Sequence, residues 1–263
     1  MRTRHQRTVR AFVLAVMVMV GTGITGASAR AEEITVLAAG AVQKPVAELI
    51  AEFTKRRPEA KVTVAYDTVG ALRDRVLGGE SPDLVLLSEA GLKALKERGR
   101  LERGQMIPLG RTGVGLCAPL SAGAIDISTP EKLKAALLAA KSIAHADPAR
   151  GATAGTHFRK VLSDLGILEQ LGSRLTVVPF GGTIAGQVAK GEFALGVSQA
   201  TEIVPNKDVQ FLGTLPEPHA LWTVYGLASV KGLRIPDSAA AELAVLIMGE
   251  EGHAAFAKAG FSP

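Results

Sequence analysis

The chain has 263 residues, of which 47% are hydrophobic and 21% charged, a globular composition that excludes a largely disordered protein. Five of its 30 lysines and arginines lie in residues 1–31, which hold no acidic residue, so 25 basic and 25 acidic residues remain beyond them. The formal charge of +5 therefore comes from the N-terminal segment. A nucleic-acid partner, which would need a basic face on the folded protein, is not expected.

The N-terminal segment is typical of a secretory signal peptide. Four arginines precede the apolar run "AFVLAVMVMV" at residues 11–20, and two overlapping A-x-A patterns follow it, ending at Ala29 and Ala31. An uncleaved membrane anchor is the alternative, but the apolar run is shorter than the ~20 residues that a membrane span needs. We predict a signal peptide over residues 1–31, cleaved near Ala29 or Ala31, and a periplasmic protein.

From residue 34 the chain alternates short aliphatic runs with longer helical patterns. The predicted strands of this first series cover residues 34–40, 61–66 and 83–89, and the predicted helices cover residues 42–58, 69–79 and 90–101. Repeated strand–helix units are typical of an α/β fold with a mainly parallel sheet flanked by helices. The strand ends at 38–41, 67–70 and 87–89 each lead into a helix, so we expect free backbone N–H groups to meet in one crevice.

A second series of the same kind follows. Its predicted strands lie within residues 142–148, 174–183 and 193–203, and its predicted helices cover residues 129–138, 156–167 and 184–192. Thr129 is the expected N-cap of the first of these helices, with Pro130 at its first position and Glu131 in its first turn. The loop "DPARGATAG" at 147–155 takes the place in this series that the loops at 38–41 and 67–70 take in the first.

Two such series predict two lobes that face each other across a cleft. We place lobe 1 at residues 32–113 and 215–263, the latter with a strand and two helices, and lobe 2 at residues 114–214. Extended crossover segments at 106–118 and 215–228 are expected to join the lobes and to give hinge closure a physical basis.

The reactive residue types do not form a recognisable catalytic or metal-binding pattern. Cys117, the single cysteine, lies in the apolar segment "GVGLCAPL" and is expected to be a buried core residue. The histidines lack ligand spacing, so we expect no protein-bound metal and no cofactor. Ser88 and Glu89 are the best candidate pair for a secreted hydrolase, a remote alternative, but adjacent helical positions do not face each other. We expect a protein that is not an enzyme.

Several stretches resemble the periplasmic solute-binding proteins of ABC importers, in particular the molybdate-binding branch of the type II periplasmic binding fold. The matching stretches are "ITVLAAGAV", "VTVAYDTVGALRDRV", "SPDLVLLSEAGLKALKERGRL", "IAHADPARGATAGTHFRKVLSDLGI" and "VAKGEFALGVSQATEI". The resemblance implies a two-lobed α/β fold, a small anionic ligand, clamshell closure and the permease subunits of an ABC transporter as partners. We expect the protein to be a monomer.

The chain departs from this family where the family binds its anion. Molybdate binders resemble "AAAS" and "SSG" after the first two strands, whereas Gly40, Thr68 and Val69 stand here, and Gln199 replaces a typical tyrosine. The second-lobe loop is about two residues longer and carries Arg150. A molybdate- or tungstate-type oxyanion remains one expected ligand, and a metal would enter the site only as part of it. A small organic di- or tricarboxylate is the alternative, because arginine favours planar bidentate partners.

The predicted ligand-binding residues come from the strand ends and loops of both series. They are Ala39, Gly40, Thr68, Val69, Gly70, Ser88, Arg150, Thr153, Gly155, Thr156, Gly182, Thr183 and Gln199.

Overall fold

The computed structural model describes residues 32–101, 106–230 and 238–263. The predicted signal peptide lies outside the described residues. Among the described segments, no helix combines the length and the hydrophobicity needed to cross a bilayer.

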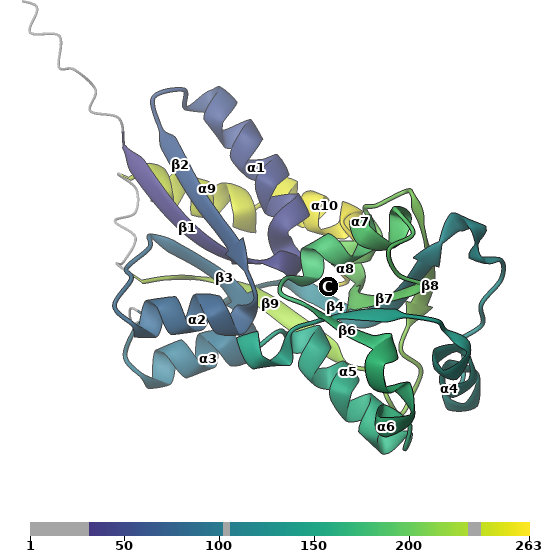
Figure 1. The fold of residues 1–263 in the computed structure, drawn as a ribbon. Coiled ribbons are helices and arrows are strands. Elements are labelled where there is room, and N and C mark those ends of the chain that lie inside the picture. The colour runs from purple at the N-terminus through teal and green to yellow at the C-terminus, as the bar shows by residue number, and fades with distance from the viewer. Residues whose placement is uncertain (1–31, 102–105, 231–237) are drawn as a thin grey trace, which may run out of the picture. The chain divides into compact units, whose positions relative to one another are not determined.

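The first lobe is an α/β layer built on three parallel strands and one antiparallel strand (Figure 1). Its strands are β1 (Glu33–Ala39), β2 (Lys61–Asp67), β3 (Leu84–Ser88) and β9 (Trp222–Ser229). Its helices are α1 (Gln43–Arg56), α2 (Val69–Leu77), α3 (Glu89–Glu97), α9 (Ala239–Met248) and α10 (Glu250–Lys258), with a 3-10 turn η1 (Gly40–Val42) ahead of α1. Helices α2 and α3 cover one face of the sheet, and α1, α9 and α10 cover the other.

The second lobe repeats the plan with shorter elements. Its strands are β5 (Ile143–Ala146), β6 (Leu175–Val178), β7 (Leu195–Gln199) and β8 (Val209–Thr214). Its helices are α4 (Pro130–Ala139), α5 (Thr153–Asp164), α6 (Leu168–Leu171), α7 (Ile184–Ala189) and α8 (Ala200–Ile203), with 3-10 turns η2 (Leu120–Ala122), η3 (Pro148–Arg150), η4 (Gly172–Arg174) and η5 (Gly181–Thr183). Strand β5 lies between β6 and β7 and pairs with both in parallel.

One long strand, β4 (Ile107–Pro119), belongs to both lobes. It pairs with β9 through Gly113 and with β7 and β8 from Val114 onward, always antiparallel. The strand order is therefore β2-β1-β3-β9-β4-β7-β5-β6, with β8 also on β4. Strand β4 is the first expected crossover. The second expected crossover, residues 215–228, is extended only from Trp222, where β9 begins. The lobe boundaries at 113/114 and 214/215 stay predictions.

Buried hydrophobic residues form one core in lobe 1 and two cores in lobe 2. Strand β3 is buried along its length, as expected for a strand covered by helices on both faces. Cys117 is fully buried as predicted, and burial raises the pKa of its thiol to about 12. The predicted cap at Thr129 is confirmed, because its hydroxyl accepts the Lys132 N–H.

Two parts of the second lobe differ from the prediction. Helix α5 begins at Thr153, three residues before the predicted start, because the small residues of "TAG" continue the helix backward. The predicted strand at 193–203 is strand β7 followed by the four-residue helix α8, which brings a glutamate to the strand end.

Candidate functional site

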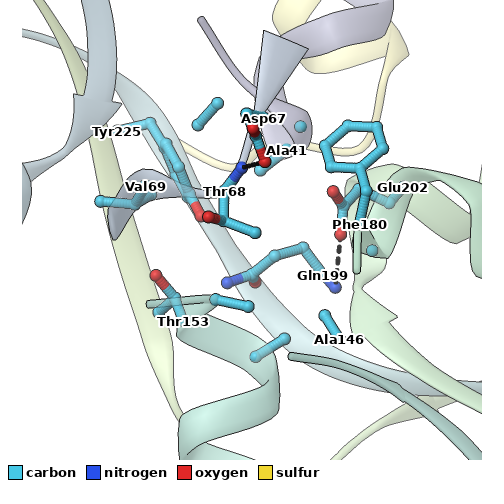
Figure 2. A pocket seen from close by; sticks show the side chains of 15 residues that line it. Ala41, Asp67, Thr68, Val69, Ala146, Thr153, Phe180, Gln199, Glu202 and Tyr225 are labelled. Atoms are coloured by element: carbon cyan, nitrogen blue, oxygen red, sulfur yellow. Dashed lines mark hydrogen bonds between the residues drawn. The ribbon is translucent and has the colours of Figure 1, made fainter. Parts of the chain in front are cut away.

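A small cavity lies where the ends of strands from both lobes meet (Figure 2). Its volume is about 30 Å³, space for about two water molecules. Its walls come from the ends of β1, β2, β5 and β7, the first turns of η1, α2, α5 and η5, helix α8 and strand β9. The lining residues are Ala39, Gly40, Ala41, Asp67, Thr68, Val69, Ala146, Ala152, Thr153, Ala154, Phe180, Gly181, Gln199, Glu202 and Tyr225.

Four helical segments begin with residues that line this cavity: η1 at Gly40, α2 at Val69, α5 at Thr153 and η5 at Gly181. The first N–H groups of a helix have no acceptor within the helix and carry its positive dipole end. The N-cap residues of η1 and α5 are alanines, which supply no side-chain acceptor. Backbone donors are therefore available to a negatively charged group in the cavity.

The Gln199 side chain is the clearest unpaired polar group in the cavity. Gln199 is 3% exposed, and neither its Nε2 nor its Oε1 has a hydrogen bond of ordinary geometry to the described residues, although the Tyr225 hydroxyl and the Glu202 backbone N–H lie near it. The side chain reaches from the Glu202 side of the cavity toward Thr153 and Tyr225 (Figure 2). A buried amide with such weakly placed partners is costly, so this amide can bind a ligand group, as a donor, an acceptor or both.

Glu202 brings a carboxyl group to the same wall. Its Oε2 accepts hydrogen bonds from the Ser198 hydroxyl and, at 3.2 Å, from the Gln199 N–H. Burial raises the pKa of Glu202, and these two hydrogen bonds oppose the shift only in part. Burial, and secondarily the Glu202 carboxyl, also raise the pKa of Tyr225.

Gly40 is a glycine because Glu202 and Phe180 fill the space that a side chain would need. A Cβ atom at Gly40 would overlap Glu202 Oε1 and would lie 2.6 Å from the Phe180 ring. A serine, as in the molybdate-binding pattern, therefore does not fit while the two lobes stand in this arrangement. The space that a serine hydroxyl at residue 40 of lobe 1 would take is thus filled by the Glu202 carboxyl group of lobe 2.

Two loops, one from each lobe, meet beside the cavity. Thr68 Oγ1 donates to the Arg150 carbonyl at 2.5 Å and accepts the Ala71 N–H at 3.2 Å, while the Gly70 N–H donates to the Gly151 carbonyl at 3.2 Å. The Thr68 hydroxyl is therefore already used by the protein. We call this contact between residues 67–70 and 150–151 the loop contact.

Arg150 belongs to the loop contact and does not line the cavity. Its Nη2 lies 2.8 and 2.7 Å from the two carboxylate oxygens of Asp67, which raises the pKa of the guanidinium. Asp67 also accepts the Thr68 N–H at 2.7 Å. The guanidinium thus serves a protein carboxylate here.

The structure brings together six of the thirteen predicted site residues. Those that line the cavity are Ala39, Gly40, Thr68, Val69, Thr153 and Gln199. Gly70, Ser88 and Thr156 line a neighbouring groove of about 400 Å³.

The remaining four predicted residues have other surroundings. Arg150 is in the loop contact, and Gly155 faces the Ala146 carbonyl so closely that no Cβ would fit. Gly182 faces the outer side of the Phe180 ring, and the Thr183 hydroxyl donates to the Phe180 carbonyl at 2.9 Å.

Sequence reasoning missed three polar lining residues. Asp67 stands directly before Thr68 in a strand end that was singled out, so its position was available. Glu202 could be placed at the cavity only once α8 was known to follow directly after β7. Tyr225 comes from β9, where its pairing with Ser88 depends on the sheet order and leaves no local signal.

Ser88, considered with Glu89 for a hydrolase, has a structural role here, and the histidine that lines the same neighbouring groove, His157, has a backbone partner. Ser88 Oγ caps α3 by accepting the Gly91 N–H at 3.3 Å, and Glu89 is exposed on the first turn of that helix. His157 Nε2 lies 2.7 Å from the His219 carbonyl. Within the described residues, no group of three histidine, cysteine or acidic side chains is arranged to hold a metal ion.

Comparison with solved structures places this geometry in a known fold. The chain is similar to the periplasmic molybdate-binding protein of Azotobacter vinelandii, with a TM-score of 0.72 and 18% identity over 88% of this chain and 99% of that one. It is also similar to the sulfate-binding protein of Mycobacterium tuberculosis H37Rv, with a TM-score of 0.66 and 19% identity over 88% of this chain and 87% of that one. The fold is therefore the two-lobed fold of periplasmic binding proteins.

Sequence comparison adds an enzyme and a family. The chain is 25% identical to an aconitate isomerase of a Pseudomonas species over 219 residues, which cover 81% of each protein. Residues 34–262 match the family model described as bacterial extracellular solute-binding protein. Because this match spans nearly all the described residues, the chain belongs to the family of bacterial extracellular solute-binding proteins.

Proposed function

We propose that the protein is a periplasmic substrate-binding protein that captures a small organic di- or tricarboxylate between its lobes and delivers it to the permease of an ABC importer. The observation that carries this proposal is the mixed lining of the cavity. The unpaired Gln199 amide and the helix starts offer polar contacts, whereas seven of the fifteen lining residues are alanine, valine or phenylalanine.

This lining suits an organic acid better than a tetrahedral oxyanion. An oxyanion presents oxygen atoms in every direction, and each oxygen that faces a methyl group or the Phe180 ring loses water without a replacement. An organic acid instead has a hydrocarbon skeleton to place against apolar side chains and carries its charge at its ends. The similarity to an aconitate isomerase supports a carboxylate ligand independently.

A molybdate- or tungstate-type oxyanion is the second candidate. The specific observation in its favour is the cavity volume of about 30 Å³, well below the ~300 Å³ of a small organic-ligand pocket. A polycarboxylate requires the lobes to separate further than they do here. The hydrogen bonds and the ion pair of the loop contact are the interactions that such opening would break.

The proposed mechanism is a clamshell. The ligand docks on one lobe, and the second lobe closes over it about the hinge that β4 offers. Closure is favoured only by contacts that the ligand makes better in the closed state. The helix starts at Gly40 and Val69 in lobe 1 and the Gln199 amide with the start of α5 in lobe 2 would supply these contacts. A monomer that carries no catalytic activity fits this role.

The ligand is tested by thermal unfolding of residues 32–263 with citrate, aconitate, malate and succinate in one set and molybdate, tungstate and sulfate in the other. A ligand at about a thousand times its Kd stabilises the protein by about 4 kcal/mol, and each 1 kcal/mol raises the Tm by roughly 2–4 °C at this size. We expect a polycarboxylate to raise the Tm. A shift with molybdate alone would establish the second candidate, and no shift with either set would refute both.

Gln199→Leu is the matched test of the site. Gln187→Leu, which also removes a buried unpaired amide oxygen but lies outside the cavity, is its control. We expect the ligand-induced Tm shift to be lost in Gln199→Leu and kept in Gln187→Leu.

The absence of catalysis is tested with aconitate. The protein is incubated with cis- and with trans-aconitate, and the isomer ratio is followed by NMR. We expect the ratio to stay at that of a protein-free sample. Interconversion by the protein would contradict the proposed role and would place the chain with its isomerase relative.

A further inference from the structure

Glu202 lies in the proposed anion site, and the described residues place no cation against it. Its Oε2 is engaged by Ser198 and Gln199, and its Oε1 lies beside Gly40, at the cavity. Another acidic side chain of the cavity, Asp67, is different, because Arg150 binds it directly. The charge balance of the pocket therefore depends on what surrounds Glu202.

The elements packed against α8 supply few charges. They are α1, α7, β4, β7, β8, η1 and η5, and η1, η5, α7, β7 and β8 contain no titratable side chain. On β4 the titratable groups are Cys117, which is buried, and Arg111, which lies over the Trp222 ring at 5.4 Å. Tyr225 and the Arg150-bound Asp67 are the other titratable residues that line the cavity.

Helix α1 carries several charges, but they are paired with one another or with α10. Lys44 lies 3.3 Å from Glu48, and Lys55 lies 3.5 Å from Glu52. Arg56 binds Glu52 and Glu251. Among the described residues of these packed elements, no cation is positioned to neutralise a Glu202 carboxylate.

A bound anion would make an ionised Glu202 still less favourable, since two like charges would share a poorly hydrated space. A neutral carboxylic acid has the opposite effect, because it offers an O–H donor to the anion. Gly40 leaves room for this group at the point where the molybdate-binding pattern has a serine hydroxyl. The carboxyl then takes the role of a donor that reaches the ligand from the other lobe.

We propose that Glu202 binds the anion as a neutral carboxylic acid, which donates a hydrogen bond from Oε1 to the ligand and couples binding to the uptake of one proton. This inference rests on the proposed function, because it requires an anion in the cavity. The proton comes from solvent, and no covalent bond changes. Glu202 is then a residue that sets specificity, since it favours ligand groups that accept a hydrogen bond.

The experiment is isothermal titration calorimetry of the wild-type protein and Glu202→Gln with aconitate and with molybdate as probes. Titrations in buffers of different ionisation enthalpy count the protons taken up. We expect the wild type to take up as much as one proton more than Glu202→Gln does. The Kd of the wild type should rise with pH, by as much as roughly tenfold per pH unit. In Glu202→Gln, which keeps a donor but cannot titrate, that part of the pH dependence should disappear. Glu192→Gln, an exposed change outside the cavity, should behave as wild type.

The outcomes separate this inference from the proposed function. If the wild type binds a probe but takes up no more protons than Glu202→Gln even at a pH where the free Glu202 is ionised, the Glu202 proposal is wrong while the binding function stands. If neither probe binds, the proposed function fails. Infrared spectra of the ligand-free proteins set the pH range of the titrations, because a protonated Glu202 gives a C=O band that Glu202→Gln must lack and can take up no further proton on binding.

Discussion

Replacing Arg150 by alanine tests whether this arginine binds the ligand or only joins the lobes. The guanidinium holds both oxygens of Asp67 and is 42% exposed at its side chain. Exposed ion pairs contribute about 0–1 kcal/mol. If the Arg150–Asp67 pair forms only when the lobes close, it can strengthen ligand binding by no more than this free energy. We therefore expect Arg150→Ala to weaken binding by at most about fivefold.

A direct contact with the ligand predicts a much larger effect. Hydrogen bonds to charged groups contribute about 1.5–3 kcal/mol, which is roughly ten- to hundredfold in Kd. The backbone part of the loop contact is kept in Arg150→Ala, because Thr68 donates to the main-chain carbonyl of residue 150. The variant thus isolates the guanidinium.

The assay is titration calorimetry of the wild type, Arg150→Ala and Arg73→Ala with the ligand found in the thermal screen. Arg73 is the control, since it pairs with Asp74 on the exposed side of α2. We expect the small effect of Arg150→Ala to shrink further at high salt, where exposed charges are screened. A loss of about thirtyfold or more that persists at high salt would refute this reasoning and would place Arg150 on the ligand.

Three further predictions concern stability. Gly155→Ala places a methyl group onto the Ala146 carbonyl, so we expect a loss of about 3 kcal/mol and a Tm lower by about 6–12 °C; a drop below about 2 °C would contradict it. Thr68→Val removes both an N-cap, worth about 1 kcal/mol, and a bond to the other lobe, so chemical denaturation should show a larger loss than for Thr129→Val, which removes a cap and an exposed hydrogen bond to Glu131 in the same helical turn. Because burial raises the pKa of Glu202 above 4.5, its favourable contribution is present below that pH and is lost as pH rises through the native pKa. Urea unfolding should therefore show Glu202→Gln gaining stability relative to wild type as pH rises, and a constant difference would count against the shift.

The fold could be predicted because it follows from local, repeated signals. Aliphatic runs bounded by helical patterns gave the strands and helices of both lobes, and Thr129 could be identified as a cap from three adjacent residues. Helix α8 was missed because four residues at a strand end do not produce a helical period. Strand β8 was missed because its sequence is only partly apolar, and its place on β4 depends on a pairing between distant segments.

The site could be predicted in part for the same reason. Strand ends of a parallel sheet meet in space, so Thr68, Val69 and Thr153 could be assigned to one cavity from the element order. Arg150 could not be separated from them, because sequence shows that a loop carries an arginine but not that Asp67 across the cleft binds it. Which residue pairs with a charged side chain depends on the tertiary structure. Here the pairing with Asp67 changes the expected role of Arg150.

The ligand is hardest to predict because the residues that decide it compensate one another across the cleft. At Gly40 the sequence shows the loss of a hydroxyl, which by itself predicts weaker anion binding. The structure shows Glu202 and Phe180, more than a hundred residues away along the chain, filling the space of that hydroxyl. If Glu202 is neutral when the anion binds, the number of donors is restored, while the donor moves to the other lobe and the Phe180 ring adds an apolar surface. The change at residue 40 then alters the kind of anion that fits, and a count of lost hydroxyls alone misjudges the site.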